Sequence, residues 1–346
     1  MRLRRLSPIA VLAVAGIGWT VGGQLSQYHL DLAVTILTYL AIAQAWNILG
    51  GYAGQISLGA AAFTGVGGYA AALLMIHTGA SWPLGIVAGG LAGPAIALLI
   101  SVPLLRLRGD YFAVGSLAAA VALEAWMENW QWAGGTIGLT LPFNKIPSLK
   151  ALFHIAIVVA GLALLAVLYV KNSTFGLRLT AIRDNEQAAE GLGVSAHRHR
   201  LAALVLSSCL TGLAGAVVAI QATAIEPSGM FSLAWSLNAL LMCIVGGAGT
   251  FTGPIVGVLV IYYGLTKQFE SAQTAATAIE GALLIVIVRF APSGIWPSLL
   301  SLAARLRGRS NLAQPRPAGQ SSRQNSSRSA PPSDEQEGVV VDAEIV

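Results

Sequence analysis

The stretch Lys171–Arg200, KNSTFGLRLTAIRDNEQAAEGLGVSAHRHR, decides the fold because it is a polar island between two long apolar runs. The runs on either side, Ala151–Val170 and Leu201–Gln221, each approach the ~20 apolar residues that a helix needs to cross a ~30 Å hydrocarbon layer. Charges occur along the whole island, at Arg178, Arg183, Asp184, Glu186, Glu190, Arg198 and Arg200. This alternation predicts an all-α membrane protein whose island lies in water at the membrane surface.

The composition supports the same class. Hydrophobic residues make up 55% of the 346 residues and charged residues 10%, with a mean hydropathy of +0.70, whereas soluble domains average roughly a quarter charged residues. The net charge of +5 does not indicate a nucleic-acid partner, because the basic residues cluster at segment ends and near the C-terminus. Cys209 and Cys243 both lie in apolar runs, which predicts packing roles rather than a disulfide or zinc site.

Ten apolar segments are candidate spans, which predicts a polytopic bundle of about ten transmembrane helices surrounded by membrane lipids. They are Pro8–Gly23, Leu30–Leu49, Ala60–His77, Pro83–Leu105, Tyr111–Glu128, Ala151–Val170, Leu201–Gln221, Leu233–Val245, Gly253–Phe269 and Ala275–Phe290. The basic start before Pro8–Gly23 also fits a signal peptide, but no small-residue cleavage site follows, so we interpret this segment as an uncleaved span. Leu233–Val245 is shorter than a span requires.

The arginines orient the bundle. Ten crossings place the N-terminal arginines, Arg106, Arg108, the island and the arginines after the last span on one side, and the positive-inside rule makes that side the cytoplasm. Both termini are then cytoplasmic, and Gln131–Lys150 is the main external loop. We expect residues 1–306 to form the membrane domain with residues 171–200 as a cytoplasmic loop, and residues 307–346 to form a disordered cytoplasmic tail, because the tail has little to bury.

The middle of the island is predicted to be a short amphipathic helix. Four residues can share one face of it: Ile182, Ala188, Ala189 and Leu192. Arg183 and Glu186 would pair at i,i+3 on another face, and Gly191 and Gly193 would end the helix. Such a helix at the membrane surface is suited to docking in a groove of another protein, while the alternative is an ordinary cytoplasmic loop.

Two glycine-rich polar stretches, Gly50–Gly59 and Gly246–Pro254, interrupt the apolar pattern. Irregular backbone at membrane depth needs polar partners, so such breaks occur inside the protein or along a watery path. The polar side chains near them that would line a translocation path are Asn47, Gln55, Ser57, Thr250 and Thr252. The alternative is that both stretches are tight cytoplasmic turns.

Glu280 is the best candidate for a functional charge inside a span, although a carboxylate favoured by a helix start would give the same pattern.

Small residues recur every four positions in two places. Gly85, Gly89, Gly93 and Ala97 form one set, and Gly249, Gly253 and Gly257 form another. Each set would line one face of a helix and let a neighbouring backbone approach closely. We therefore expect a tightly packed bundle.

No motif for catalysis or for a cofactor is present in the sequence. It lacks a GxxxxGKS/T motif, so P-loop hydrolysis of a nucleotide would belong to a partner. His197 and His199 stand two apart, on different helix faces, and have no nearby carboxylate or cysteine set for a metal. The sequence therefore predicts a protein that is not an enzyme and binds no cofactor or metal.

Three stretches resemble one family of transport proteins. Gln44–Gly59, followed by Gly65–Tyr69, is similar to the signature region of the branched-chain amino-acid ABC importer permeases, the LivM/LivH family. Gly176–Gly193 resembles that family's cytoplasmic loop, and Ser236–Pro254 resembles its third recurring stretch. The resemblance covers roughly residues 30–290 and favours the LivM half.

The resemblance implies a permease subunit in the inner membrane of a bacterium. It would import branched-chain amino acids together with a second, LivH-like permease, two ABC ATPase subunits and a periplasmic binding protein. The residues presented to the ATPase would be Arg183, Asp184, Glu186, Ala188, Ala189, Gly191 and Gly193. Gln187 departs from the EAA…G pattern of ABC permeases, which puts position-by-position matching in doubt. The alternatives are a urea or amide permease of the same family and an ion-coupled secondary transporter or channel.

Overall fold

The computed structural model describes residues 11, 16, 19–20, 26–107 and 109–266. Almost all of the first predicted span, the last predicted span with Glu280, and the C-terminal tail lie outside these residues. The helices are α2 (Gln27–Trp46), α3 (Ala60–His77), α4 (Trp82–Leu104), α5 (Asp110–Asn129), α6 (Leu149–Asn172), α7 (Thr174–Asp184), α8 (Glu186–Gly191), α9 (Ala196–Ala222), α10 (Pro227–Met230), α11 (Leu233–Gly246) and α12 (Gly253–Val258).

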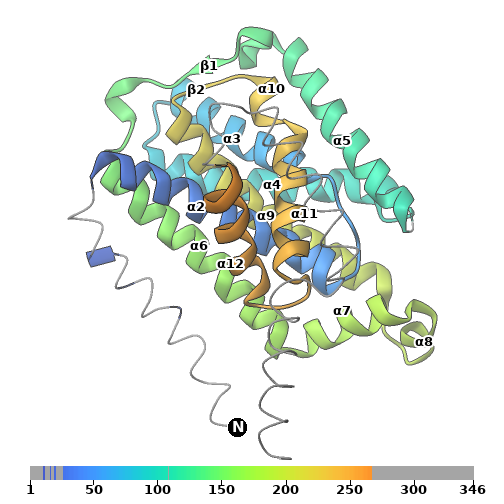
Figure 1. Ribbon diagram of the computed structural model, residues 1–346. Helices are drawn as coiled ribbons and strands as arrows, with labels where there is room; N and C mark the ends of the chain where they lie inside the picture. Colours follow the sequence, from blue (N-terminus) through green and yellow to red (C-terminus); the bar gives the residue numbers. More distant parts are fainter. Residues whose placement is uncertain (1–10, 12–15, 17–18, 21–25, 108, 267–346) are drawn as a thin grey trace, which may run out of the picture. The chain divides into compact units, whose positions relative to one another are not determined.

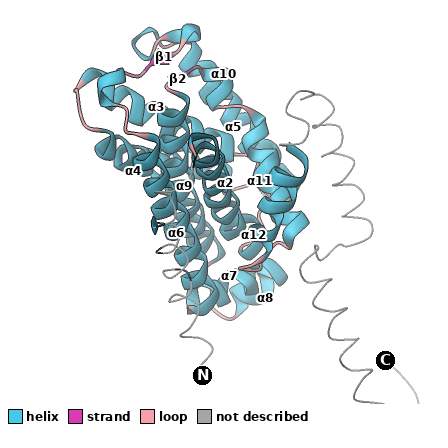
Figure 2. Ribbon diagram, turned by 60° about the vertical axis from the view of Figure 1, so that its left-hand side comes forward, coloured by secondary structure: helices cyan, strands magenta, loops and turns pink. Residues whose placement is uncertain are grey.

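Shorter elements complete the described part of the chain. Two π-helical segments, η1 (Asn47–Tyr52) and η5 (Leu259–Thr266), continue α2 and α12. The loop between α5 and α6 holds three 3-10 turns, η2 (Gln131–Ala133), η3 (Gly135–Ile137) and η4 (Phe143–Lys145). Strands β1 (Leu139–Thr140) and β2 (Ala224–Ile225) pair antiparallel, with Leu139 opposite Ile225. This two-residue ladder is a small departure from the all-α prediction, which the described residues otherwise confirm (Figure 2).

Six segments among the described residues are long and apolar enough to cross a membrane. They are Gln27–Tyr52, Ala60–His77, Trp82–Leu104, Leu149–Asn172, Ala196–Ala222 and Pro227–Gly246. The first five closely match predicted spans. α5 forms where a span was predicted but is not among the six, and its acidic residues Asp110, Glu124 and Glu128 lower its hydropathy. The count of ten therefore remains a prediction.

The expectation that Leu233–Val245 is too short for a span is wrong. Pro227, which suits the first turn of a helix, starts α10, so the apolar segment begins six positions before Leu233. Ser232 then caps α11 by accepting a hydrogen bond from the Ala234 amide. Together α10 and α11 give a 20-residue candidate span.

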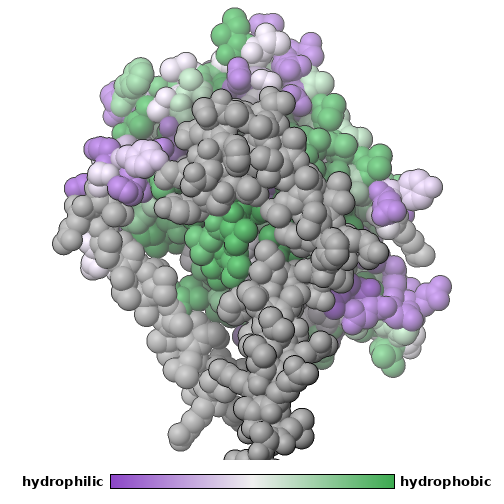
Figure 3. All heavy atoms as spheres, in the orientation of Figure 1, coloured by the Kyte–Doolittle hydropathy of each residue, from purple (hydrophilic) through white to green (hydrophobic). Residues whose placement is uncertain are grey.

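α7 and α8 lie at one end of the helices, and β1, β2 and α10 lie at the other, as both ribbon views show (Figures 1 and 2). We call these the island end and the loop end. Hydrophilic residues gather over both ends of the visible face, with hydrophobic residues between them (Figure 3). This distribution is the one expected of a bundle whose middle lies in lipid.

The first predicted glycine stripe packs three helices together. Gly67 of α3, Gly89 of α4 and Gly212 of α9 meet so closely that a Cβ at Gly89 would lie 2.7 Å from the Gly67 carbonyl oxygen and 3.0 Å from that of Gly212. Gly93 lies equally tightly against the Ser208 backbone. The second stripe is only partly helical, because Gly249 lies in a turn and α12 begins at Gly253.

Candidate functional site

The polar island folds into two helices rather than one. Ser173 caps α7, its hydroxyl accepting a hydrogen bond from the Gly176 amide (3.3 Å). Asn185 is extended (φ −158°, ψ 103°) and ends α7, while its side chain accepts from the Ala188 amide (3.0 Å) and so caps α8. α8 ends at Gly191, and Gly193, two residues later, has φ +83°, in the left-handed region that favours glycine.

The break at Asn185 changes which residues share a face. Ile182, Ala189 and Ala196 form a small buried cluster with Val194 packed against it. Leu192, predicted to lie on the same face, is instead 86% exposed. The prediction assumed one unbroken helix, in which Ile182 and Leu192 would share a face. The extended conformation of Asn185 interrupts the helix, so Leu192 does not lie on that face.

The ion pairs of the island also differ from the predicted Arg183–Glu186 pair. Arg183 pairs with its neighbour Asp184 (Nη2 to Oδ1 3.0 Å) near solvent. Glu186 forms a bidentate pair with Arg200, both oxygens lying 2.9 Å from the guanidinium, and these side chains are only 22% and 14% exposed. The Glu186–Arg200 pair thus joins α8 to the start of α9, and a bidentate charged pair is stronger than a single hydrogen bond between neutral groups.

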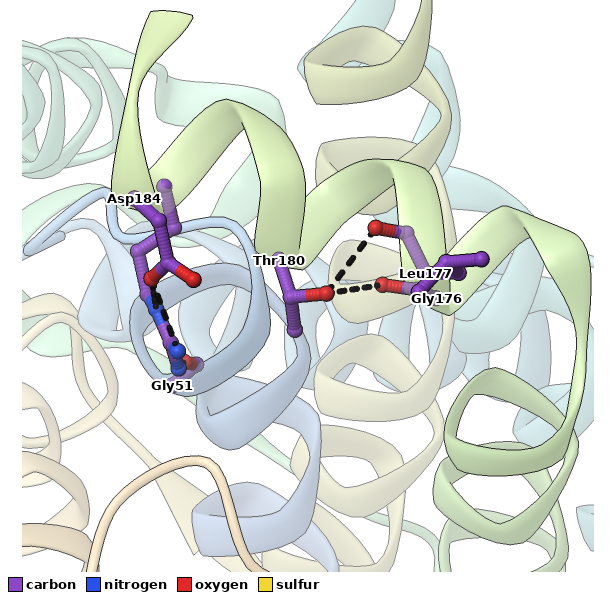
Figure 4. Close-up of polar contacts among 6 residues, drawn as sticks. Gly51, Gly176, Leu177, Thr180 and Asp184 are labelled. Atoms are coloured by element: carbon purple, nitrogen blue, oxygen red, sulfur yellow. Dashed lines mark hydrogen bonds and ion pairs between the residues drawn. The ribbon is translucent and has the colours of Figure 1, made fainter. Parts of the chain in front are cut away.

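Arg183 also reaches the first glycine stretch. Its Nη1 donates a hydrogen bond to the Gly51 carbonyl oxygen (2.9 Å). In Figure 4 this hydrogen bond is drawn as a dashed line beside the labels Gly51 and Asp184. Its aliphatic stem occupies the place of a Cβ on Gly54, a residue with φ +70°. Thr180 on the same helix turns back instead, donating to the Gly176 and Leu177 carbonyls (Figure 4). Arg183 thus links α7 to the first glycine stretch by a hydrogen bond and by its aliphatic stem.

The two glycine stretches meet at the same place. The Asn47 amide donates to the Thr250 carbonyl (2.8 Å), and its oxygen accepts from the Gly249 amide (2.8 Å). A Cβ on Gly51 would collide with Asn47 Oδ1 and the Gly249 nitrogen. We call this contact of Asn47, Gly51, Gly249 and Thr250 the glycine junction. It is buried at Asn47 and covered by Arg183 from the island.

The side chains of the other predicted path residues form none of the hydrogen bonds that join the two glycine stretches. Ser57 Oγ accepts from the Gly59 amide (3.1 Å), and the Ser57 carbonyl accepts from the Trp46 indole (2.7 Å). Thr250 Oγ1 bonds within its own turn, to the Gly247 carbonyl and the Gly253 amide. The Gln55 side chain is buried and its Oε1 has no hydrogen-bond partner among the described residues. Thr252, half-buried, directly precedes α12.

Sequence reasoning missed the contacts that build this site. Gln44, whose amide donates to the Phe251 carbonyl (3.0 Å), and Arg200 were not singled out for any role in holding the site together. Asn47 and Thr250 are 203 positions apart, and Arg183 and Gly51 are 132 apart. In the sequence, the glycine clusters and the nearby Asn47 indicate which residues take part in the site. They do not indicate which of these residues contact each other.

The chain is a multi-pass membrane protein: an apolar helix bundle with a hydrophilic two-helix segment fastened to buried turns at one end. Residues 28–288 match the family described as the permease component of branched-chain amino acid transport systems, and the chain belongs to this family. The resemblance predicted from its motifs is confirmed. It is an ABC-transporter permease subunit, and its family is one of transport subunits rather than enzymes.

Permeases from several organisms are similar to this chain. LivM of Escherichia coli K12, a high-affinity branched-chain amino acid permease, is 25% identical over 84% of this chain and 74% of its own length. A probable LivM of Methanocaldococcus jannaschii is 24% identical over 62% of this chain and 68% of its own. The L-arabinose permease AraH of Azospirillum brasilense is 25% identical over 75% and 77%. No solved structure gives a significant match to the chain.

Proposed function

We propose that this chain is the permease subunit of an ATP-driven importer that carries branched-chain amino acids, or a related small polar solute, from periplasm to cytoplasm. The observation that carries the proposal is the fastening of the hydrophilic α7–α8 segment to the buried glycine junction through Arg183. A partner that moves this segment in water can thereby act on the membrane-buried part of the chain. The partners are a second, LivH-like permease, two ABC ATPase subunits and a periplasmic binding protein.

The exposed face of α7 and α8 supports docking of an ATPase. Leu177 of α7 and Leu192, directly after α8, are 71% and 86% exposed although they are apolar, and Asp184 and Glu190 of the same segment are exposed as well. Exposed apolar side chains among charged ones are typical of a surface that another protein covers. Ala188, Gly191 and Gly193 are also exposed and belong to this face.

The remaining predicted coupling residues face their own chain. Ala189 is buried against Ile182, Glu186 holds Arg200, and Arg183 holds Gly51. We therefore divide the predicted set in two: an exposed part that meets the ATPase and an inward part that transmits its movement. ATP binding would draw the ATPases together, and the bundle would switch between two packed arrangements rather than bend gradually.

The charges support the orientation as well. Arg106, Lys171, Arg178 and Arg198 lie at the island end, whereas Lys145 and Lys150 lie in or next to the loop at the other end. The positive-inside rule then places the island end in the cytoplasm of an inner-membrane protein. Labelling single cysteines introduced at exposed positions of each end, in intact cells with a membrane-impermeant maleimide, tests this: a cysteine at Leu192 that reacts from outside overturns the proposal.

The central experiment uses the whole transporter in proteoliposomes. Arg183→Ala should lower ATP-driven uptake at least tenfold while ATPase subunits still co-purify, because the transmitting contact is lost and the docking face remains. Leu192→Asp should instead weaken co-purification. Arg178→Ala is the matched control, since Arg178 is exposed on the same helix and bonds no described residue. Normal coupling in Arg183→Ala refutes the transmission role, and uptake without any ATPase refutes the importer.

A further inference from the structure

A cavity of about 360 Å³ lies at the loop end. Its walls come from η3, β1, the end of α9, β2, α10 and the start of α11, and its lining includes Thr140, Val218, Ala224, Ile225, Glu226 and Met230. Its volume falls in the range of small-molecule sites, roughly 300–1,000 Å³. None of these residues belongs to the glycine junction or the polar island.

The walls are fixed in place by contacts of their own. β1 pairs with β2, and the Leu141 amide adds a hydrogen bond to the Thr223 carbonyl (2.8 Å). Thr223 has φ +62°, a conformation that costs a threonine free energy and needs support from its surroundings. The Trp235 indole donates to the Gly229 carbonyl (3.1 Å), and its ring lies 5.2 Å from that of Tyr39. These contacts hold the segments that form the walls of the cavity in place.

The lining is apolar apart from one carboxylate and one hydroxyl. Glu226 is exposed, and its carboxylate makes no hydrogen bond or ion pair with any described residue. A Cβ built on Gly229 would lie 3.8 Å from Glu226 Oε1, so the carboxylate lies beside the cavity wall. The eleven lining residues include no lysine or arginine. The site thus offers one negative group at its edge and aliphatic and aromatic surface behind it.

We propose that this cavity is an outer solute site that binds the ammonium group of a branched-chain amino acid at Glu226 and its aliphatic side chain against Val218, Ile225 and Met230. The solute's carboxylate stays toward water, away from Glu226. A sugar fits poorly. Thr140 has the only side-chain hydroxyl in the lining, so most hydroxyl groups of the sugar would lose their hydrogen bonds on binding. An exposed single carboxylate binds weakly, which suits a site that must pass its solute on.

This inference rests on the proposed function for its solute, but its test does not require transport. Ala224→Cys places a thiol in the lining, and Asn144→Cys, on an exposed position of the neighbouring loop, is the control. Both are made in the full transporter in proteoliposomes, with the unsubstituted protein giving the background from Cys209 and Cys243. Thr140→Cys, also exposed in the lining, replaces Ala224→Cys if that variant does not assemble.

We expect leucine to slow maleimide labelling at Ala224→Cys at least threefold and to leave Asn144→Cys unchanged. N-acetyl-leucine, which lacks the ammonium group, and L-arabinose should not protect. Adding Glu226→Gln should abolish protection by leucine. Equal protection by N-acetyl-leucine or L-arabinose, or no protection by leucine in either cysteine variant, overturns the proposal. Uptake that needs no ATPase would instead refute the proposal that the protein belongs to an ATP-driven importer. Protection of the cysteine is measured without ATP, so it tests the cavity independently of that outcome.

Discussion

The two ends of the helices differ in how they treat polar groups. At the island end, Arg183, Asn47 and Glu186 each have partners at 2.8–3.0 Å, and Gly51 has no room for a methyl group. At the loop end, the Glu226 carboxylate makes no hydrogen bond or ion pair with a described residue and borders a cavity of about 360 Å³. In the function proposed above, the tight and paired end transmits movement, and the end with space and an unpaired carboxylate receives the solute.

Aromatic residues sharpen this contrast. Trp130 lies near Trp126 and Trp132, with ring centroids 5.0 and 5.4 Å apart, and Trp132 stacks on His77 at 4.1 Å. Tryptophans concentrate where a membrane meets water, because the indole combines an apolar ring with a polar N–H. The aromatic cluster at the loop end is of the kind expected at a membrane–water interface, whereas the described contacts of the island end include two ion pairs.

The largest expected effect comes from filling the tight end. Gly51→Ala forces Asn47 or the Gly249 backbone to move, so we expect at least a tenfold loss of uptake and a destabilisation of ~1–3 kcal/mol, as for other overpacked cores. Gly229→Ala is the loop-end counterpart, where the new methyl would meet Glu226 Cγ at an ordinary 3.5 Å. Thermal unfolding in detergent measures the stability of both variants. Equal unfolding midpoints would show that the two ends do not differ in how tightly they are packed at these glycines.

Removing the amide that joins the glycine stretches should have the next largest effect. Asn47→Ala leaves the part-buried Gly249 amide and Thr250 carbonyl without their side-chain partner, which should lower the free energy of unfolding by ~1–3 kcal/mol. Asn129→Ala at the exposed end of α5 removes a single hydrogen bond to the Ala125 carbonyl and should change stability by less than ~1 kcal/mol. Chemical unfolding of the two variants measures both free energies. A similar loss of stability in both would contradict the role of Asn47 in joining the two glycine stretches.

Within the island end, the two ion pairs should differ. A double-mutant cycle on Glu186 and Arg200 should give a coupling of roughly 1.5–3 kcal/mol, because the pair is bidentate and largely shielded from water. The same cycle on Arg183 and Asp184, which are 37% and 68% exposed, should give only ~0.2–1 kcal/mol. Raising the salt concentration should weaken the second coupling more than the first. A larger coupling for the exposed pair would reverse this ranking.

The smallest effect on stability is expected at the loop end. Glu226→Gln removes a carboxylate that no described residue bonds, so the unfolding midpoint should stay unchanged within error. The half-saturation concentration for uptake of leucine should nevertheless rise several-fold, because the ammonium partner is gone. Glu190→Gln, an exposed carboxylate at the other end, is the control for a general charge effect. A marked loss of stability in Glu226→Gln would show a structural rather than a binding role.

The sequence by itself determined the class of protein, the course of most spans and the presence of a hydrophilic island. Span positions could be predicted because hydropathy over about twenty residues is a local property, and lipid forces each such segment into a helix. The motifs that led to the family were local too. Ala60–His77, for example, is the same segment in the prediction and in the structure.

Only the tertiary structure decided how these segments are joined. The break at Asn185, the lengthening of the Leu233 segment by α10, the Arg183–Gly51 contact and the Asn47–Thr250 clamp each depend on neighbours brought close by packing. A polar side chain in a bundle can satisfy its hydrogen bonds with any backbone that packing brings near, so spacing along the chain does not fix the choice. The cavity beside Glu226 is likewise a property of three-dimensional packing, because its walls come from residues 137–140 and 218–235, which are far apart in the sequence.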